Sequence, residues 1–199
     1  MDLPIELPTE LSDQLALALD AEGKIPRALE ALGPLAGRDV LLLGRDGERS
    51  LHRLTELGAR ATAIDWPSSG SAPVEGASAD ALVSMWNGFR GVDSDEVAEA
   101  DRILRPGGRL LIVHDYGRDD VSRLRGELPE YGSWSRVNGP FLSAGFRIRV
   151  VHCWWTFDTI AAAAAFLAAA FGKAGETLAG GLRRPRLSYN VAIYHRTRP

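Results

Sequence analysis

Val40-Leu-Leu-Leu-Gly44-Arg-Asp-Gly47-Glu48, followed by Ala61-Thr-Ala-Ile-Asp65, is the stretch of sequence that decides the fold. The apolar run is typical of a strand covered on both faces, and it breaks into a glycine turn at Gly44. Leucines at 51, 54 and 57 then predict a helix with one apolar stripe, and a second strand ends at Asp65. This order is typical of a nucleotide-cofactor site, because a carboxylate after the second strand accepts hydrogen bonds from both ribose hydroxyls.

The length and composition of the chain limit the number of domains and the classes of partner. At 199 residues with 45% hydrophobic residues, it can build one sizeable core, which predicts a single domain. Its 23 basic and 26 acidic residues give a net charge of −3, so we expect neither nucleic acid nor an anionic membrane as a partner. One cysteine, Cys153, and an N-terminus without a signal pattern predict a cytoplasmic location.

Predicted helices and strands alternate along the chain. Helices at about 10–19 and 26–35 form an N-terminal helical extension over residues 1–37. An α/β domain over 38–199 follows, with strands at 39–43, 60–64, 80–84, 109–114, 146–152 and 189–195 and helices at 48–57 and 94–104. Such alternation predicts a parallel sheet covered by helices. The alanine-rich run 160–171 has 12 residues, fewer than the roughly 20 that cross a bilayer, and is interpreted as a buried or interface helix.

The segment Leu104-Arg-Pro-Gly-Gly-Arg-Leu110 lies between a predicted helix and a predicted strand. Proline stops the helix and the two glycines permit a tight reversal. This segment resembles the Leu-(Arg/Lys)-Pro-Gly-Gly-Arg-Leu segment of class I S-adenosylmethionine-dependent methyltransferases. Residues 78–84, 141–148, 156–159 and 194–196 are also similar to segments of that family. The resemblance implies a Rossmann-like methyltransferase fold, with a mostly parallel sheet, helices on both faces and a C-terminal antiparallel strand.

The glycine motif of the first turn departs from the family pattern. By resemblance, Gly44 matches the first glycine of the motif, but Asp46 and Glu48 stand where the second and third are usual, with Gly47 displaced between them. Side chains there obstruct the approach of S-adenosylmethionine to bare backbone. The residues alone also allow a structural role, with Asp46 as a helix N-cap and Glu48 as a first-turn carboxylate. The motif is therefore degenerate.

The third strand of the family pattern is missing from the sequence. Asp65 and Asp80 are 15 positions apart, whereas one strand-helix-strand unit takes about 30 residues. In the family this strand lies at the edge of the sheet, so its loss is tolerable. The turn-rich segment 66–78 would replace it and would supply part of the adenine wall through Trp66.

Ligands of open parallel sheets bind beyond the carboxyl ends of the strands, and the candidate residues are taken from there. The resemblance implies S-adenosylmethionine as the cofactor, held by Gly44, Gly47, Asp65, Trp66 and Ser84. Methyl transfer aligns a nucleophile with the donor and needs a base when the acceptor is a hydroxyl or an ammonium. The candidates for that catalytic role are His114, Asp115 and Tyr116; the alternative for the His-Asp pair is a solvated turn.

Aromatic and amide side chains are the candidates for the acceptor site. Trp86 and Asn87 suit a small-molecule pocket, because an indole stacks on a ligand and an amide orients a polar group; the alternative for Trp86 is core packing. Trp154 and Trp155 would line an acceptor site, form a homodimer interface or pack in the core. Asn87 is followed by Gly-Phe, unlike the Asn-Pro-Pro-Tyr motif of amino-directed methyltransferases, so a nucleic-acid base is not expected as acceptor. The histidine spacing predicts no metal site.

Two functions are compatible with this pattern. The first is a methyltransferase that uses S-adenosylmethionine and acts on a small molecule. The second is a non-catalytic protein of the same fold, in which the degenerate site is closed and the surface serves protein association or regulation. A nicotinamide-dependent oxidoreductase would require a Gly-x-Gly-x-x-Gly turn, which the sequence lacks.

Overall fold

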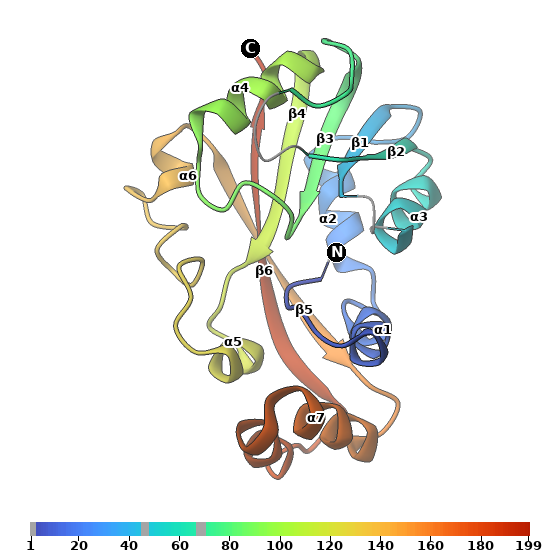
Figure 1. Cartoon of the computed structure of the whole chain (residues 1–199), viewed down its shortest axis with the longest axis vertical. Helices are drawn as coiled ribbons and strands as arrows, with labels where there is room; N and C mark the ends of the chain where they lie inside the picture. The colour runs from blue at the N-terminus through green and yellow to red at the C-terminus, as the bar shows by residue number, and fades with distance from the viewer. Residues whose placement is uncertain (1–2, 45–47, 67–70) are drawn as a thin grey trace.

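A computed structural model describes residues 3–44, 48–66 and 71–199, and within them the chain forms a six-stranded sheet with helices on both faces (Figure 1). The strand order is β2-β1-β3-β4-β6-β5. Strands β1 to β4 are parallel, and β6 is antiparallel to both of its neighbours. The bounds are β1 Asp39–Leu43, β2 Arg60–Ile64, β3 Ala79–Met85, β4 Leu104–Asp115, β5 Arg147–Thr156 and β6 Arg186–Thr197. The predicted fold class is confirmed.

The helices lie on the two faces of this sheet. Their bounds are α1 Thr9–Ala18, α2 Lys24–Leu32, α3 Glu48–Glu56, α4 Ser94–Ile103, α5 Asp120–Arg125, α6 Pro140–Ser143 and α7 Ile160–Ala179. In Figure 1, α4 and α6 are on the opposite side of the sheet from α1, α2 and α3. The alanine-rich helix α7 is longer than predicted, and it continues past a kink at Gly172. The short helices α5 and α6 were not predicted, because neither is long enough to show a repeating apolar stripe.

Strand β1 is buried on both of its faces, which explains its unbroken apolar run. Val40 and Leu42 belong to the cluster under α1, α2, α3 and α7, while Leu41 and Leu43 belong to the cluster under α4 and α6. Leu15 of α1 and Leu29 of α2 are fully buried in the first of these clusters. The N-terminal helical extension therefore shares its core with the sheet.

Strand β2 is the edge strand of the sheet beside β1. No strand lies between β2 and β3 within the described residues of that segment, 65–66 and 71–78. Instead, α4 holds the returning chain through two of its side chains. The Arg102 guanidinium donates to the carbonyls of Ala72 and Val74 at 3.3 and 2.9 Å, and Glu99 accepts from the amide of Ala72 at 2.7 Å. These bonds replace the backbone pairing that a further strand would provide.

The Pro-Gly-Gly segment lies within β4 rather than ahead of it. Strand β4 begins at Leu104, and its pairing with β3 shifts register between Leu104 and Arg109. Gly107 has a φ of +78°, and its amide donates to the carbonyl of Arg198 at 3.1 Å. Helix α4 thus ends where predicted, but the next strand begins five residues early, because Leu104 already pairs with Ala79 of β3 and the glycines bond to Arg198, one residue past β6.

Candidate functional site

Most of the predicted site residues meet at the carboxyl ends of the parallel strands. Gly44 follows β1, Asp65 follows β2, Trp86 and Asn87 follow β3, and His114 and Asp115 end β4. Since parallel strands end at one edge of the sheet, these residues lie around a common edge. Gly47, together with the proposed N-cap Asp46, lies outside the described residues.

Gly44 and Asn87 are in direct contact. Gly44 has a φ of +103°, and its amide donates to the carbonyl of Ile64 at 2.8 Å. The Asn87 side-chain amide donates to the carbonyl of Leu43 at 3.3 Å, and a Cβ added to Gly44 would lie 2.1 Å from that nitrogen. The space that glycine leaves open beside the first strand is therefore filled by a side chain of the protein itself.

Asp65 and Trp66 form the more open part of this edge. Asp65 is exposed and follows Ile64, which pairs with Leu43 of β1. Trp66 is half-buried and its ring centroid lies 5.5 Å from that of Phe89. A carboxylate and an indole side by side provide the groups that bind a ribose and an adenine, respectively. Asp65 and Trp66 thus remain the candidates for the nucleoside half of S-adenosylmethionine.

The turn after β3 covers the end of that strand. Trp86, Gly88 and Phe89 all have positive φ values, of 53°, 67° and 48°. The hydroxyl of Ser84, which is fully buried, donates to the carbonyl of Asn87, and the amide of Phe89 donates to Glu96 at 3.0 Å. Glycine adopts such a φ without strain, but Trp86 and Phe89 do not, so these bonds must hold the strained backbone of the turn in place. Ser84 therefore lies beneath this turn rather than at the surface.

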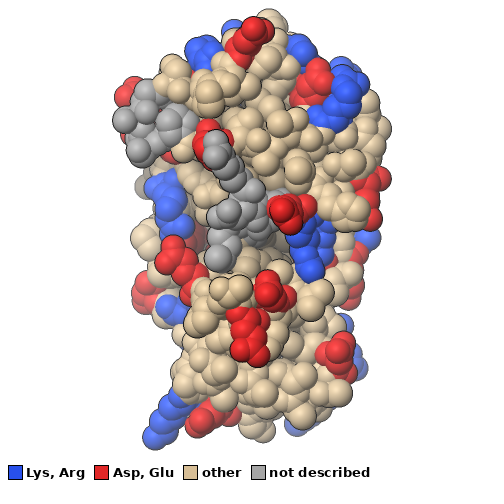
Figure 2. Space-filling view, turned by 45° about the vertical axis from the view of Figure 1, so that its right-hand side comes forward, with Lys and Arg blue, Asp and Glu red and all other residues tan. Residues whose placement is uncertain are grey.

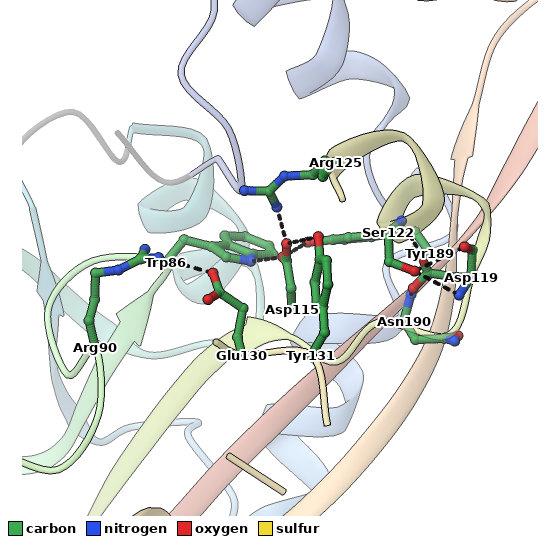
Figure 3. Close-up of polar contacts among 10 residues, drawn as sticks. All are labelled: Trp86, Arg90, Asp115, Asp119, Ser122, Arg125, Glu130, Tyr131, Tyr189 and Asn190. Carbon is green, nitrogen blue, oxygen red and sulfur yellow. Dashed lines mark hydrogen bonds and ion pairs between the residues drawn. The ribbon is translucent and has the colours of Figure 1, made fainter. Parts of the chain in front are cut away.

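Asp115 is the centre of a buried hydrogen-bond network (Figure 3). Its carboxylate accepts from the Trp86 indole at 2.9 Å, from the Tyr131 hydroxyl at 3.4 Å and from the Tyr189 hydroxyl, and it pairs with Arg125. Burial raises the pKa of Asp115, and the charge of Arg125 opposes that rise. With 2% of the residue exposed and four donors around it, the carboxylate has no free direction toward a ligand in this arrangement.

His114 is buried on the other face of β4. Its Nε2 lies 3.1 Å from the carbonyl of Phe89, and its ring meets the Trp134 ring edge-on at 5.1 Å. Burial, with the nearby charge of Arg90, lowers the pKa of His114 from 6.5 to about 4. The imidazole is therefore neutral at pH 7, and the contact with Phe89 indicates that Nε2 carries the proton.

Tyr116 extends beyond the end of β4 and is half-buried. Its amide donates to the carbonyl of Asn190 at 2.9 Å, and the Arg118 guanidinium lies 5.6 Å from its ring centroid. Of the three residues proposed for catalysis, it is the one with substantial solvent access.

The two tryptophans of β5 lie farther along the sheet. Trp155 is fully buried and packs on Tyr189 at 5.6 Å and on the rings of Phe166 and Phe171. Trp154 is half-buried, with the Arg186 guanidinium 4.1 Å from its ring centroid. Trp155 thus packs on Tyr189, whose hydroxyl donates to Asp115, whereas Trp154 faces a different surface.

Several residues of the network could not be found by sequence reasoning. Asp115 receives its bonds from residues 10, 16, 29 and 74 positions away, at Arg125, Tyr131, Trp86 and Tyr189. Glu130, which is nearly fully buried, pairs with Arg90 across 40 positions at 3.0 Å. The only available signal was the general rule that a buried carboxylate needs donors, and that rule does not say which donors.

Metal and membrane sites receive no support from the described residues. Among them, no group of three His, Cys, Asp or Glu side chains is arranged to hold a metal ion. Within the same residues, every helix is too short or too polar to span a membrane. Acidic and basic side chains are scattered over the face seen in Figure 2, with uncharged surface between them.

The strand order, together with a carboxylate after β2 and a glycine after β1, defines a methyltransferase-like class of Rossmann fold. No family model matches the sequence, and no curated protein matches it. Among solved structures, an S-adenosylmethionine-dependent methyltransferase from Aquifex aeolicus is similar, with a TM-score of 0.54, 16% identity and coverage of 98% of this chain and 100% of the other.

Two further solved structures have the same fold. A proposed type II methyltransferase from Anaeromyxobacter dehalogenans matches with a TM-score of 0.55 and 20% identity over 86% of this chain and 95% of the other. A chain from the complex of the Haloferax volcanii Trm112 methyltransferase activator with a proposed methyltransferase matches with a TM-score of 0.52 and 16% identity over 94% and 99%. At these identities the likeness concerns the fold alone: this chain has the fold of S-adenosylmethionine-dependent methyltransferases.

Proposed function

We propose that the chain binds S-adenosylmethionine at the carboxyl ends of β1, β2 and β3 and is a methyltransferase of a small molecule. The observation that carries this proposal is the exposed carboxylate of Asp65 directly after β2, one residue beyond the Ile64 carbonyl that accepts from the Gly44 amide at 2.8 Å. Fold alone does not define an activity, whereas a carboxylate at this position has the chemistry that a ribose requires.

In this proposal each residue at the carboxyl edge of the sheet contacts a different part of the donor. Asp65 accepts hydrogen bonds from the ribose hydroxyls, and Trp66 contacts the adenine. Asn87, whose amide donates to the Leu43 carbonyl at 3.3 Å, would have to release that bond to hold the amino-acid end of the donor. When bound, S-adenosylmethionine supplies an activated methyl group.

The buried residues of β4 then have a positioning role. Asp115 holds the Trp86 indole at 2.9 Å, and His114 holds the carbonyl of Phe89 at 3.1 Å, so both fix the turn that contains Asn87. Because neither reaches solvent, neither can take a proton from the acceptor, which favours an acceptor atom that is already unprotonated at neutral pH, such as a carboxylate oxygen. Tyr116 is the remaining candidate for contact with that acceptor.

Isothermal titration calorimetry with S-adenosylmethionine and S-adenosylhomocysteine tests the donor site. We expect binding by the wild type and at least about a tenfold loss in Asp65→Ala, the size of a lost hydrogen bond to a charged group. Glu176→Ala removes the same charge from an exposed position on α7 and serves as the control. An absence of heat at millimolar ligand, or equal affinity in the two variants, contradicts the proposal.

A second candidate function is a non-catalytic scaffold for protein association. It is favoured by the Asn87 amide that fills the open side of Gly44 and by the internal bonds that surround Asp115. The Haloferax structure shows that a chain of this fold is found in a protein complex. If the protein has this function, it binds neither S-adenosylmethionine nor S-adenosylhomocysteine, and Asn87→Ala does not bind them either. Light scattering, which measures solution mass, separates a monomer from a homodimer.

A further inference from the structure

A second concave surface lies beyond the carboxyl end of β5, away from Asp65 and Gly44. It is formed by the end of β5, the C-terminal turn of α7 and the loop that leads into β6, at the end of the molecule where α7 is seen in Figure 1. Its volume is about 360 Å³. The residues that matter for its chemistry are Trp154, Leu178, Leu182, Arg183, Arg184 and Arg186. We call this surface the α7 groove.

The α7 groove has an apolar wall held in place by the sheet. Trp154 and Arg186 belong to the strands β5 and β6, which pair here through Thr156 and Arg186. The Arg186 guanidinium lies 4.1 Å from the Trp154 ring centroid, a cation–π contact that keeps both side chains ordered. Leu178 and Leu182 are half-buried and complete the wall. Such a surface can cover an aliphatic or aromatic chain.

The rim of the α7 groove carries an excess of positive charge. Arg183 and Arg184 are exposed, and neither has an ion-pair partner in the part of the chain that the structure describes. The one acidic residue that lines the groove, Asp120, is already engaged: it accepts from the Ser188 amide and hydroxyl at 2.9 and 2.6 Å and from Arg123 at 3.0 Å.

Glu22 is close enough to Arg186 for the two charges to interact, but its carboxylate is paired with another cation. Its carboxylate contacts the Lys24 ammonium at 2.9 Å, so it does not cancel the charge of Arg183 and Arg184. Two unpaired guanidinium groups beside an apolar wall favour a ligand with a negative head and an apolar body, because guanidinium binds carboxylate and phosphate oxygens through paired hydrogen bonds.

We propose that the α7 groove binds a small amphipathic anion, with a carboxylate or phosphate head between Arg183 and Arg184 and an apolar body against Trp154, Leu178 and Leu182. Small-molecule pockets usually have volumes of about 300–1,000 Å³, so a groove of about 360 Å³ suits a short chain or a single aromatic ring. The site shares no residue with the proposed donor site, and it stands whether or not the chain binds S-adenosylmethionine.

Calorimetry with four probes tests the groove in the intact chain. Octanoate and octyl phosphate carry both the head and the chain, whereas octanol lacks the charge and acetate lacks the chain. We expect the two complete probes to bind at least about tenfold more tightly than octanol or acetate, and more weakly as salt is raised, because exposed charges are screened. The tighter of the two complete probes identifies the head group as carboxylate or phosphate.

A pair of double variants with the same change in charge locates the site. R183A/R184A removes both free guanidinium groups and is expected to weaken octanoate binding about tenfold or more. R147A/R149A removes two exposed arginines at the opposite end of β5 and is expected to bind like the wild type. Thermal unfolding confirms that both variants fold. Equal binding by the two variants, binding of octanol as tight as that of octanoate, or no binding of either complete probe by the wild type overturns the proposal.

Discussion

The carboxyl edge of the sheet differs between its two sides. At the end of β2, Asp65 is exposed and Trp66 is half-buried. At the end of β4, His114 and Asp115 are 1% and 2% exposed, and the protein itself supplies their hydrogen-bond partners. Both sides lie where this fold class binds ligands, but the carboxylate on the β2 side is exposed, whereas the carboxylate on the β4 side is buried. Topology therefore gives the place of a site, whereas local packing decides whether its residues can meet a ligand.

The difference also separates two uses of a carboxylate. Asp115 takes four donors, from the turn after β3, from α5, from the loop after α5 and from β6, so it holds these segments together. Asp65 lies at the sheet edge, where removal disturbs little packing. The same residue type should therefore respond very differently to substitution on the two sides.

The largest effect is expected from Asp115→Ala. It leaves the Arg125 guanidinium, whose side chain is 14% exposed, without its partner and strands the Tyr189 hydroxyl. Removing one of the two partners of a buried ion pair lowers the free energy of unfolding by about 3–5 kcal/mol. Urea unfolding measures this loss. D115A/R125M should recover part of it because both charges are then removed; a loss below about 1 kcal/mol in D115A would show that the network is not structural.

Because of His114, the free energy of unfolding should decrease as the pH falls below neutral. Its pKa is about 4 when folded and near 6.5 when unfolded, so the unfolded chain binds the proton first as the pH falls. Neutral His114 makes its whole contribution to the free energy of unfolding above about pH 6.5. As the pH falls from there to about 4, that contribution decreases by about 3 kcal/mol in total.

The pH dependence is isolated by comparing variants. His114→Gln should lose less stability than the wild type between pH 7 and pH 4.5 in urea unfolding. His52→Gln changes an exposed histidine with a 72% exposed side chain and should retain the wild-type slope. An equal slope in His114→Gln and the wild type would indicate that His114 is not buried in solution.

Local signals predicted most of the fold, and non-local contacts explain what they missed. Strands β1 and β2 begin and end at the residues predicted from their apolar runs and turn glycines, because strand ends depend on nearby residues. The positions of Gly44, Asp65 and Asn87 at one edge followed from the order of strands. The closure around Asp115 did not, because Tyr189 reaches it from 74 positions away. Trp155 likewise gave no sign in sequence that its neighbours would be the rings of Tyr189 and Phe166.

An intermediate effect is expected where the two sides meet, at Gly44. Gly44→Ala forces a side chain into a φ of +103° and against the Asn87 amide, so we expect a loss of about 2 kcal/mol. In the double variant G44A/N87A the clash is absent and only the backbone strain remains, so part of the loss should return. Strictly additive losses in a urea-unfolding cycle would show that the two residues do not touch.

The smallest effect on stability is expected from Asp65→Ala. Because Asp65 is exposed, its removal should change the free energy of unfolding by no more than about 0.5 kcal/mol. The same variant should lose S-adenosylmethionine binding if the β2 side is the donor site. Unfolding and calorimetry on one preparation therefore separate the two uses of a carboxylate: lost binding with unchanged stability marks a ligand-facing residue. A stability loss as large as that of D115A would place Asp65 in the packing instead, and the contrast between the two sides of the edge would no longer hold.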